Sequence, residues 1–258
     1  MGFLPFIVRV AVGYCLTSSM ATPRKRFLYF VWYFECDSKY YWALSSHGGE
    51  GVRVNMRSVT FQETEIIPNK IVCVGKNYAA HIEEMGSVPS DQMTVFMKPN
   101  ACISDQLVAH RGEQIHFETE ICLLIQGGAV AGVGVGLDLT KRATQKKLKD
   151  AGLPWERSKA FEGSAVFSHF VDAPASLTDL ELELCVDGEP RQQGGPRQML
   201  YQPQTILEEL RSFIPLEDGD IVMTGTPSGV GPVERDSLFE ARLLDAHTEL
   251  VSASWRAM

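Results

Sequence analysis

The segment His-Phe-Glu-Thr-Glu at residues 116–120 contains two carboxylates at a spacing that suits a β-strand. Side chains two positions apart on a strand point to the same face, so Glu118 and Glu120 would lie side by side. Two adjacent anions repel each other unless a cation lies between them. The apolar run at residues 121–125 continues the strand into a core. We therefore expect the pair at a strand end, near a pocket.

A third carboxylate, Asp138, follows a run of alternating glycine and apolar residues. Three carboxylates at strand ends would form a hard oxygen site suited to Mg²⁺. Each part has a simpler alternative. An Asp before a helix commonly caps that helix, and Glu181 and Glu183 repeat the glutamate spacing with nothing nearby to make them ligands. On the motif alone, a solvated strand edge is the commoner interpretation of such a pair.

His81 and Glu84 lie three positions apart in the helical segment 78–85, so their side chains face the same way. A histidine in contact with a carboxylate can orient and deprotonate a water molecule. On spacing alone, a surface pair is the commoner interpretation. The segment would need to face the carboxylates to take part in their chemistry.

Four more polar residues could hold an anionic substrate. The Gly-Thr-Pro segment at 225–227 fixes its backbone and offers the Thr226 hydroxyl and free N–H groups to a carboxylate. Arg142 and Lys159 would add positive charge, and Gln145 shares a helix with Arg142. Taken singly, these residues would be interpreted as a turn and a solvated helix face.

Short strands, separated by glycine and proline turns, are expected to position these residues. The clearest helix spans 140–151, with Thr140 as its cap and Gly152 at its end. Asp-Gly at 187–188 predicts a hairpin turn. There is no regular βαβ alternation, which argues against a doubly wound sheet. We expect strands at 71–74, 95–98, 118–125, 133–139, 180–186, 221–224, 238–244 and 249–255, and a further helix at 204–213.

Composition places the chain among ordinary globular proteins. It has 258 residues, of which 45% are hydrophobic and 22% are charged. This length buries a sizeable core without disulfides or structural metals. The net charge of −8 argues against sequence-independent nucleic-acid binding and fits carboxylates that hold a hard metal ion.

The six cysteines include no CxxC pair, which argues against a zinc site. Cys73, Cys122 and Cys185 lie in apolar, strand-like runs and are interpreted as small buried hydrophobic residues. Such usage favours a reducing, cytoplasmic location.

The first part of the chain differs from the rest. Residues 1–70 carry 8 Lys/Arg against 5 Asp/Glu, whereas the remainder carries 16 against 27. The apolar run at 2–16 is interrupted by Arg9 and is too short to span a membrane. The aromatic stretch 27–33 is typical of a strand. We interpret residues 1–50 as an extension and residues 51–258 as the catalytic domain.

Together, these motifs resemble the fumarylacetoacetate hydrolase family, in its small, single-domain, acylpyruvase-like branch. The similarity runs from Ile71 to about Val251. Five stretches carry it, in the order VCVGKNYAAHIEEMG, VFMKP, HFETEICLLI, GLDLTKRATQKKLKDAGLPWERSKAFEGSAV and DIVMTGTPSGVGP. Five motifs in one order make chance agreement a poor explanation. The resemblance implies a mainly β fold with inserted helices, a mixed β-sandwich roll, and a homodimer.

The resemblance also implies roles for the candidate residues. Metal ligands for Mg²⁺ or Mn²⁺ would be Glu118, Glu120 and Asp138. Catalytic residues would be His81, Glu84 and Lys159, and substrate-binding residues would be Arg142, Gln145 and Thr226. One departure stands out: only residues 121–137 connect Glu120 to Asp138, so the helical turn usual for the family is missing. That puts the local packing and the dimer contacts in question.

The implied substrate is a small, anionic 2-oxo acid with a carbonyl or carboxylate at C4. A metal ion would polarise the C2 oxygen. Water attack at a C4 ketone gives acylpyruvate or fumarylpyruvate hydrolysis with release of pyruvate, which the intact pair His81 and Glu84 favours. Oxaloacetate decarboxylation and keto–enol tautomerisation are the alternatives at the same site. A metal-binding but inactive homologue is a more remote alternative. No nucleic acid or membrane partner is expected.

Overall fold

The structure of the protein is a computed structural model that describes residues 8–13, 29–36, 39–45, 56–88 and 91–258. Within these residues, no helix is long and apolar enough to cross a membrane. The chain divides into two compact units, which are described separately below.

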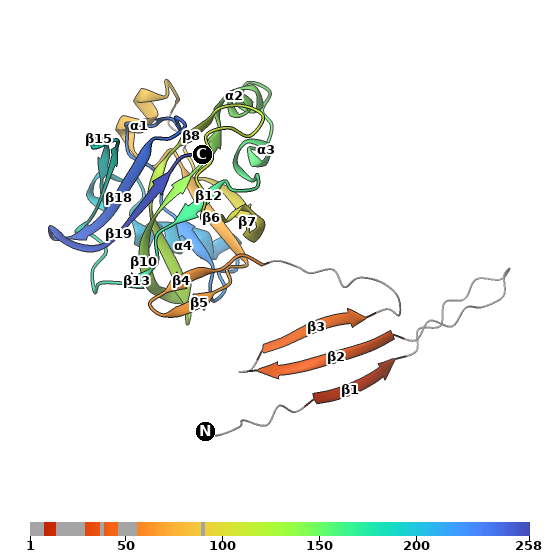
Figure 1. Ribbon diagram of the computed structural model, residues 1–258. Coiled ribbons are helices and arrows are strands. Elements are labelled where there is room, and N and C mark those ends of the chain that lie inside the picture. Colours follow the sequence, from red (N-terminus) through yellow and green to blue (C-terminus); the bar gives the residue numbers. More distant parts are fainter. Residues whose placement is uncertain (1–7, 14–28, 37–38, 46–55, 89–90) are drawn as a thin grey trace. The chain divides into compact units, whose positions relative to one another are not determined.

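The first unit, Met1–Asn55, contains a three-stranded antiparallel sheet (Figure 1). Its strands, in the order in which they pair, are β1 (Val8–Gly13), β2 (Tyr29–Cys36) and β3 (Lys39–Ser45). The aromatic stretch predicted as a strand lies mostly in β2. The functional division into an extension, 1–50, and a catalytic domain, 51–258, stays a prediction.

The second unit, Met56–Met258, is built around a large mixed sheet. Its strands pair in the order β12-β10-β9-β16-β6-β7, and β13 pairs with β10. The central strand β16 is parallel to β6 and antiparallel to β9. Most central positions are apolar and buried on both faces, as expected where a sheet is covered on both sides. The strands are β6 (Lys70–Gly75), β7 (Thr94–Pro99), β9 (Thr119–Gln126), β10 (Ala129–Asp138), β12 (Ala165–Phe167), β13 (Val171–Asp172) and β16 (Ile221–Met223).

Strands β9 and β10 form a hairpin that explains the short connection between Glu120 and Asp138. Gly127 and Gly128 have φ values of 58° and 73°, as a two-residue turn with two left-handed positions requires. The register places Glu120 opposite Gly136. A direct hairpin therefore replaces the helical turn expected for the family, and it brings the two carboxylate-bearing strand ends together.

A second, antiparallel sheet has the strand order β15-β14-β18-β19. The alternating Glu and Leu residues of β14 bury the leucines, as predicted. Leu182 and Leu243 of this sheet share a core cluster with Ile121 and Leu123 of β9, so the two sheets pack face to face. The strands are β14 (Leu180–Val186), β15 (Glu189–Gly194), β18 (Leu238–Asp245) and β19 (Thr248–Arg256). The prediction of a mainly β, sandwich-like fold is confirmed.

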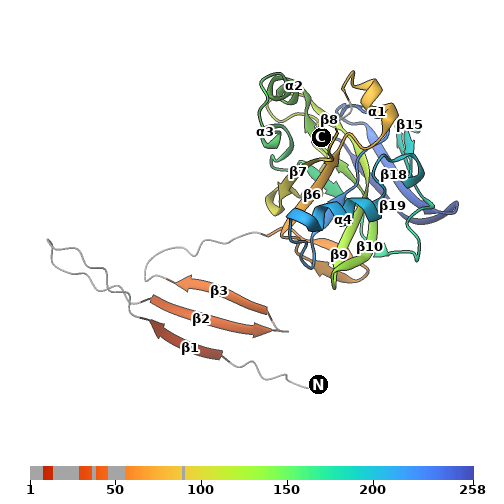
Figure 2. The same cartoon turned by 180° about the vertical axis from the view of Figure 1, so that it is seen from behind.

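Helices and short sheets complete the second unit. Helix α4 packs into the same core cluster through Ile206, Leu207 and Leu210, and Figure 2 shows it across the sheet. The helices are α1 (Ala79–Glu84), α2 (Arg142–Asp150), α3 (Glu156–Lys159) and α4 (Pro203–Phe213), with short 3₁₀ turns at Asn100–Cys102 and Pro196–Gln198. The short strands are β4 (Val59–Phe61), β5 (Thr64–Ile66), β8 (Ile115–Phe117), β11 (Thr140–Lys141) and β17 (Gly231–Pro232).

The prediction that Thr140 caps the helix is wrong. Helix α2 begins at Arg142, and its N-cap residue, Lys141, makes no capping hydrogen bond through its side chain. Thr140 lies in β11, and its hydroxyl oxygen accepts a hydrogen bond from Lys159 at 2.7 Å. The hydroxyl is therefore used by the polar centre described next rather than by the helix.

Candidate active site

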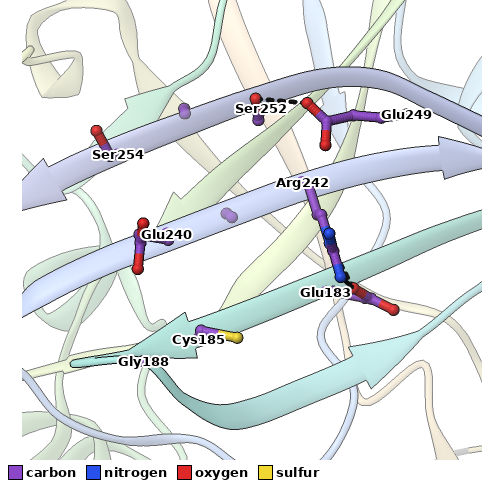
Figure 3. A pocket seen from close by; sticks show the side chains of 10 residues that line it. Glu183, Cys185, Gly188, Glu240, Arg242, Glu249, Ser252 and Ser254 are labelled. Carbon is purple, nitrogen blue, oxygen red and sulfur yellow. Dashed lines mark hydrogen bonds and ion pairs between the residues drawn. The ribbon is translucent and has the colours of Figure 1, made fainter.

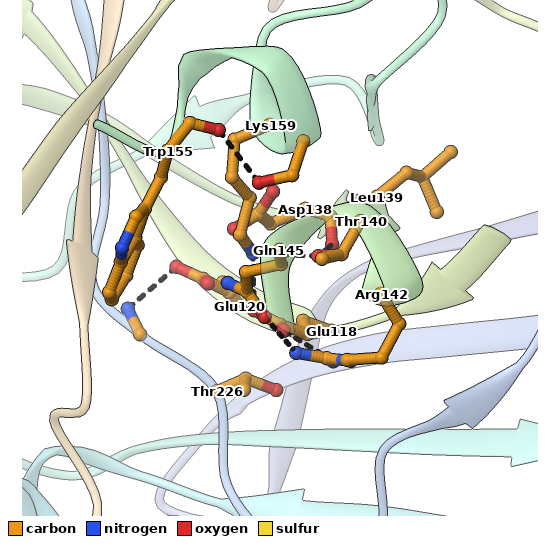
Figure 4. A network of polar contacts seen from close by, with 12 residues as sticks. Glu118, Glu120, Asp138, Leu139, Thr140, Arg142, Gln145, Trp155, Lys159 and Thr226 are labelled. Carbon is orange, nitrogen blue, oxygen red and sulfur yellow. Dashed lines mark hydrogen bonds and ion pairs between the residues drawn. The ribbon is translucent and has the colours of Figure 1, made fainter. Parts of the chain in front are cut away.

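Three carboxylates meet where β9 begins and β10 ends. Ligand oxygens of Glu118, Glu120 and Asp138 all lie within 4.8 Å of one another, and all three residues are buried. The backbone holds them in place, because the N–H of Asp138 donates to the carbonyl of Glu118 at 2.8 Å. The structure thus brings together the three residues predicted as metal ligands (Figure 4). Their role as ligands stays a prediction.

Glu118 is held by two cations. Arg142 donates to its Oε1 at 2.6 Å, and Lys159 donates to its Oε2 at 2.8 Å. Burial alone would raise the pKa of this carboxyl, but Lys159, Arg142 and His81 together hold it well below its usual range. Glu118 is therefore ionised at neutral pH.

Glu120 is in the opposite electrostatic situation. One of its oxygens accepts the backbone N–H of Gly225 at 2.6 Å. Burial, together with the charges of Asp138 and Glu118, raises its pKa well above the usual range. A buried carboxylate beside two others is stable only with a proton or a nearby cation. Three carboxylates supply hard oxygen donors, and Glu120 has no cation bonded to it among the described residues. This donor set fits a divalent cation such as Mg²⁺ or Mn²⁺.

Lys159 is the centre of the network, as Figure 4 shows. Its ammonium donates to Glu118, to Asp138 Oδ2 at 2.6 Å and to Thr140. It is buried, and although burial lowers the pKa of its amine, the charges of Asp138 and Glu118 raise it overall. Lys159 is therefore a fixed positive charge, bonded to carboxylates of two different strands.

Lys98, which lies in the VFMKP stretch, is a buried residue of this centre to which the sequence alone assigned no role. Its Nζ lies 2.9 Å from Oδ1 of Asp138. Its N–H groups nevertheless point to the carbonyl oxygens of Leu139, Lys159 and Ser164. Oδ1 therefore has a positive neighbour but no hydrogen bond from the described residues. An ammonium-bearing residue near the end of an apolar strand was the available signal.

His81 and Glu84 contact each other, as their spacing predicts. Nδ1 of His81 lies 3.3 Å from Oε2 of Glu84, whose other oxygen accepts the N–H of Gly229 at 3.0 Å. Burial lowers the pKa of His81, while the charge of Glu118 and the hydrogen bond that His81 makes to Glu84 act in the opposite direction. The imidazole is therefore neutral and able to accept a proton at neutral pH.

One narrow cleft is lined by His81 of this pair and by Glu118 of the carboxylate centre. Its walls include His81, Glu118, Arg142, Gln145 and Lys159. Arg142 also donates to Gln145 at 2.7 Å, so the two predicted substrate-binding residues of α2 form one unit.

Thr226 is buried and is not among the residues that line this cleft. Its hydroxyl oxygen accepts a hydrogen bond from Gln192 at 2.8 Å, and Gln192 also accepts the N–H of Thr119 at 2.9 Å. Gln192 is buried in β15 and was not found from the sequence, because a single Gln in a polar strand carries no pattern.

Asn77 connects the helix of His81 to the Gly-Thr-Pro loop. Its side-chain amide donates to the carbonyls of Thr224 at 2.8 Å and Tyr201 at 2.9 Å, and its oxygen accepts the N–H of Tyr201. Gly225 has φ +99°, and a Cβ there would lie 2.7 Å from Cβ of Asn77. Glycine is therefore required for the loop to reach both Asn77 and Glu120.

A separate hollow lies on the outer face of β14, β18 and β19 (Figure 3). Its walls include Glu183, Cys185, Glu240 and Arg242, and Arg242 donates to Glu183 at 2.5 Å. None of the candidate site residues lines this hollow.

Comparisons with known proteins agree with this arrangement. The family model described as the fumarylacetoacetate (FAA) hydrolase C-terminal domain matches residues 70–253. Oxaloacetate tautomerase YcgM of Escherichia coli K12 is 40% identical over 184 residues, 64% of this chain and 84% of that protein. The human mitochondrial oxaloacetate tautomerase FAHD1 is 36% identical over 189 residues, 66% of this chain and 85% of that protein.

A solved structure is also similar. Fumarylpyruvate hydrolase from Pseudomonas aeruginosa, in complex with Mn²⁺ and pyruvate, matches with a TM-score of 0.70 and 31% identity. The match covers 79% of this chain and 96% of that one. Relatives with two different reactions therefore share this fold.

Proposed function

Because the chain belongs to the fumarylacetoacetate hydrolase family, we propose that it is a metal-dependent oxaloacetate keto–enol tautomerase. The mixed β-sandwich roll expected for this family is the observed fold. One observation carries the proposal: a buried, neutral His81 faces the same cleft as the carboxylate centre. Two relatives that are 40% and 36% identical are oxaloacetate tautomerases.

Glu118, Glu120 and Asp138 would hold Mg²⁺ or Mn²⁺. When bound, such an ion supplies Lewis-acid polarisation of the C2 carbonyl and stabilises negative charge on its oxygen. The raised pKa of Glu120 supports this assignment, as does Oδ1 of Asp138, which accepts no hydrogen bond from the described residues. Arg142 and Gln145 would bind and orient the substrate carboxylate at C1, because a guanidinium and an amide donate to carboxylate oxygens. Thr226 would act through Gln192, which accepts the N–H of Thr119 between the two glutamates.

His81 would move the proton. In the keto form, its neutral imidazole accepts a proton from C3, and the C–H electron pair forms the C2–C3 double bond of the enolate. The imidazolium then returns the proton to the C2 oxygen, which gives the enol without net change in atoms or charge. Glu84 stabilises the imidazolium from 3.3 Å. Lys159 donates to both Glu118 and Asp138 and so holds the two carboxylates in place.

From the sequence we expected hydrolysis first and tautomerisation second. We reverse this order because the two tautomerases are 40% and 36% identical to this chain, whereas the fumarylpyruvate hydrolase is 31% identical. Hydrolysis of acylpyruvates is the second candidate. It is supported by the intact pair His81 and Glu84 and by the similarity to a fumarylpyruvate hydrolase. For hydrolysis, His81 would take its proton from water instead of from C3.

The test compares the purified full chain with Mg²⁺ or Mn²⁺, with chelator, and with metal alone. We expect oxaloacetate enolisation, followed by its ultraviolet absorption, to exceed the metal-only rate. Pyruvate release from acetylpyruvate and fumarylpyruvate, measured in the same buffer, tests the second candidate. If the protein enolises oxaloacetate no faster than the metal alone but releases pyruvate from the acylpyruvates, hydrolysis replaces tautomerisation as the first candidate. Full activity after exhaustive chelation contradicts the metal assignment.

We also propose a homodimer, from the family resemblance, and light scattering of the full chain would test it. The cytoplasmic location stays a prediction.

A further inference from the structure

A cation with no role in the scheme above lines the cleft. Lys149 lies on α2, seven positions after Arg142, and it shares the cleft wall with Lys76 and Trp155. It is half-buried. In the described part of the chain it has no ion-pair partner; instead, its Nζ lies 4.9 Å from the centre of the Trp155 ring.

The surroundings of Lys149 are rich in positive charge. Burial and repulsion from Arg142, Lys76 and Lys159 lower its pKa to about 8, and Glu118 is the anion that opposes them. Glu118 is already bonded to Arg142 and Lys159. This end of the cleft therefore holds more positive charge than its own carboxylates neutralise.

The position of this charge is fixed by its neighbours. The Trp155 ring lies 5.8 Å from the ring of Phe96 at a tilt of 47°, and it also packs beside Gly75, where a Cβ would lie 3.1 Å away. A packed indole gives the ammonium a defined place, because a cation is attracted to the face of an aromatic ring. Lys76, at the end of β6, has φ +57°, which is unusual for a residue with a side chain.

A stability role does not account for this arrangement. A half-buried ammonium gains nothing from three cationic neighbours, and repulsion and desolvation both act against it. Perturbed charges in a cleft are typical of places where a ligand supplies the missing counter-charge. The missing partner here is an anion.

We propose that Lys149, supported by Lys76 and Trp155, binds the second carboxylate of a dicarboxylic 2-oxo acid and thereby selects dianionic substrates over those with a neutral C4 end. The inference rests on the proposed function in that the C1 end of the substrate occupies the carboxylate centre. An ammonium on a packed ring suits a terminal carboxylate, which accepts charge-assisted hydrogen bonds. An acetyl group offers no charge to compensate the same cations.

Two stable acids that differ only at C4 provide the probe. L-malate carries a C4 carboxylate, and L-lactate ends in a methyl group instead. Calorimetric titration of the metal-loaded full chain should show tighter binding of malate than of lactate. In Lys149→Met, we expect this preference to fall by about tenfold, which corresponds to about 1.4 kcal/mol. Affinity for lactate should not change.

Lys147→Met is the matched control, because Lys147 lies on the same helix, is exposed and does not line the cleft. It makes the same change in charge and should keep the malate preference. Lys149→Arg should restore most of it, and a purely structural role would not produce that rescue. Lys149→Gln serves as a second neutral variant if Lys149→Met fails to fold.

The inference is overturned if wild-type protein binds malate no better than lactate, including when it binds neither. It is also overturned if the preference for malate over lactate is as large in Lys149→Met as in Lys147→Met. The proposed function and this inference can fail separately. If the wild type shows the Lys149-dependent preference for malate but does not enolise oxaloacetate, the inference holds and the proposed tautomerase function is contradicted. If the wild type enolises oxaloacetate but Lys149→Met leaves the malate preference unchanged, the proposed function holds and the inference about Lys149 is contradicted.

Discussion

Two pairs of glutamates with the same spacing lie in this protein in very different surroundings. Glu118 and Glu120 lie at the start of β9, where the side chain of Glu118 is 8% exposed and bonds to Lys159 and Arg142. Glu183, of the other pair, lies on the outer face of β14, is 26% exposed, and bonds to Arg242 beside solvent. The pattern determines which face a pair occupies, but not what covers that face.

The difference lies in what the neighbouring strands contribute. The β9–β10 hairpin places Asp138 beside the first pair, and α3 adds Lys159. The strand beside the second pair contributes Arg242, and its charge is screened by water. A metal site therefore requires a third carboxylate and a water-poor environment in addition to the spacing.

The largest effect is expected from Glu120→Gln. It should abolish metal-dependent activity, and the rise in melting temperature that Mg²⁺ or Mn²⁺ gives the wild type should disappear. Metal at a hundred times its dissociation constant stabilises a folded protein by about 2.7 kcal/mol. The matched change Glu183→Gln should leave both signals intact. Equal metal responses in the two variants would remove the distinction between the pairs.

Glu120→Gln also gives a test in the absence of metal, through the melting temperature of the metal-free protein. Burial, Asp138 and Glu118 raise the pKa of Glu120, so the ionised carboxylate destabilises the metal-free fold at pH values above its unfolded pKa. Glutamine is neutral at every pH. We therefore expect metal-free Glu120→Gln to melt no lower than the wild type at pH 7. A clearly lower melting temperature would show that the ionised carboxylate is favourable there.

A smaller effect is expected at the proton-transfer residue. His81→Gln should lower the rate of enolisation by about 10²–10⁴, the range for loss of a general base. Its metal-induced rise in melting temperature should match that of the wild type, since His81 is not among the carboxylates. Loss of the metal response together with activity would instead make His81 part of the metal site.

The pH dependence gives a finer test. Because burial lowers the pKa of His81, the imidazole stays neutral below the usual histidine range. On the acidic side of the pH profile, the midpoint of the decrease in kcat/KM should therefore lie below pH 6.5, the unperturbed pKa of histidine. Glu84→Gln removes a negative charge that raises this pKa, so the acidic limb should move to still lower pH. A limb that moves up in this variant would contradict the assignment.

The smallest effect is expected in the exposed pair. Arg242→Met breaks the contact with Glu183 on the outer sheet face. Exposed ion pairs contribute little because water screens them and the long side chains lose freedom. Activity should be unchanged, and the shift in melting temperature should be too small to resolve. A large loss of activity would show that this face takes part in the function.

The sequence predicted those parts that depend on local pattern. Alternation and turn residues located the strands, and the spacing of His81 and Glu84 predicted their contact. The family resemblance predicted that the three carboxylates lie close together, as they do in the structure. Lys98 and Gln192 were missed because their importance comes from strands far away in sequence. Thr140 was misassigned for the same reason: a local rule made it a helix cap, but Lys159 binds its hydroxyl.

The position of β16 has a consequence for how the chain folds during its synthesis. Among the residues that the structure describes, 221–223 alone link the β6–β7 and β9–β10 pairs in the large sheet. At about 5–20 residues per second, the ribosome needs roughly 5–20 s to proceed from the end of β9 to β16. During that interval β6 and β9 each carry an open hydrogen-bonding edge, which is prone to pairing with other chains. The site can assemble only when this late strand arrives, so nascent chains are expected to depend on chaperones until then.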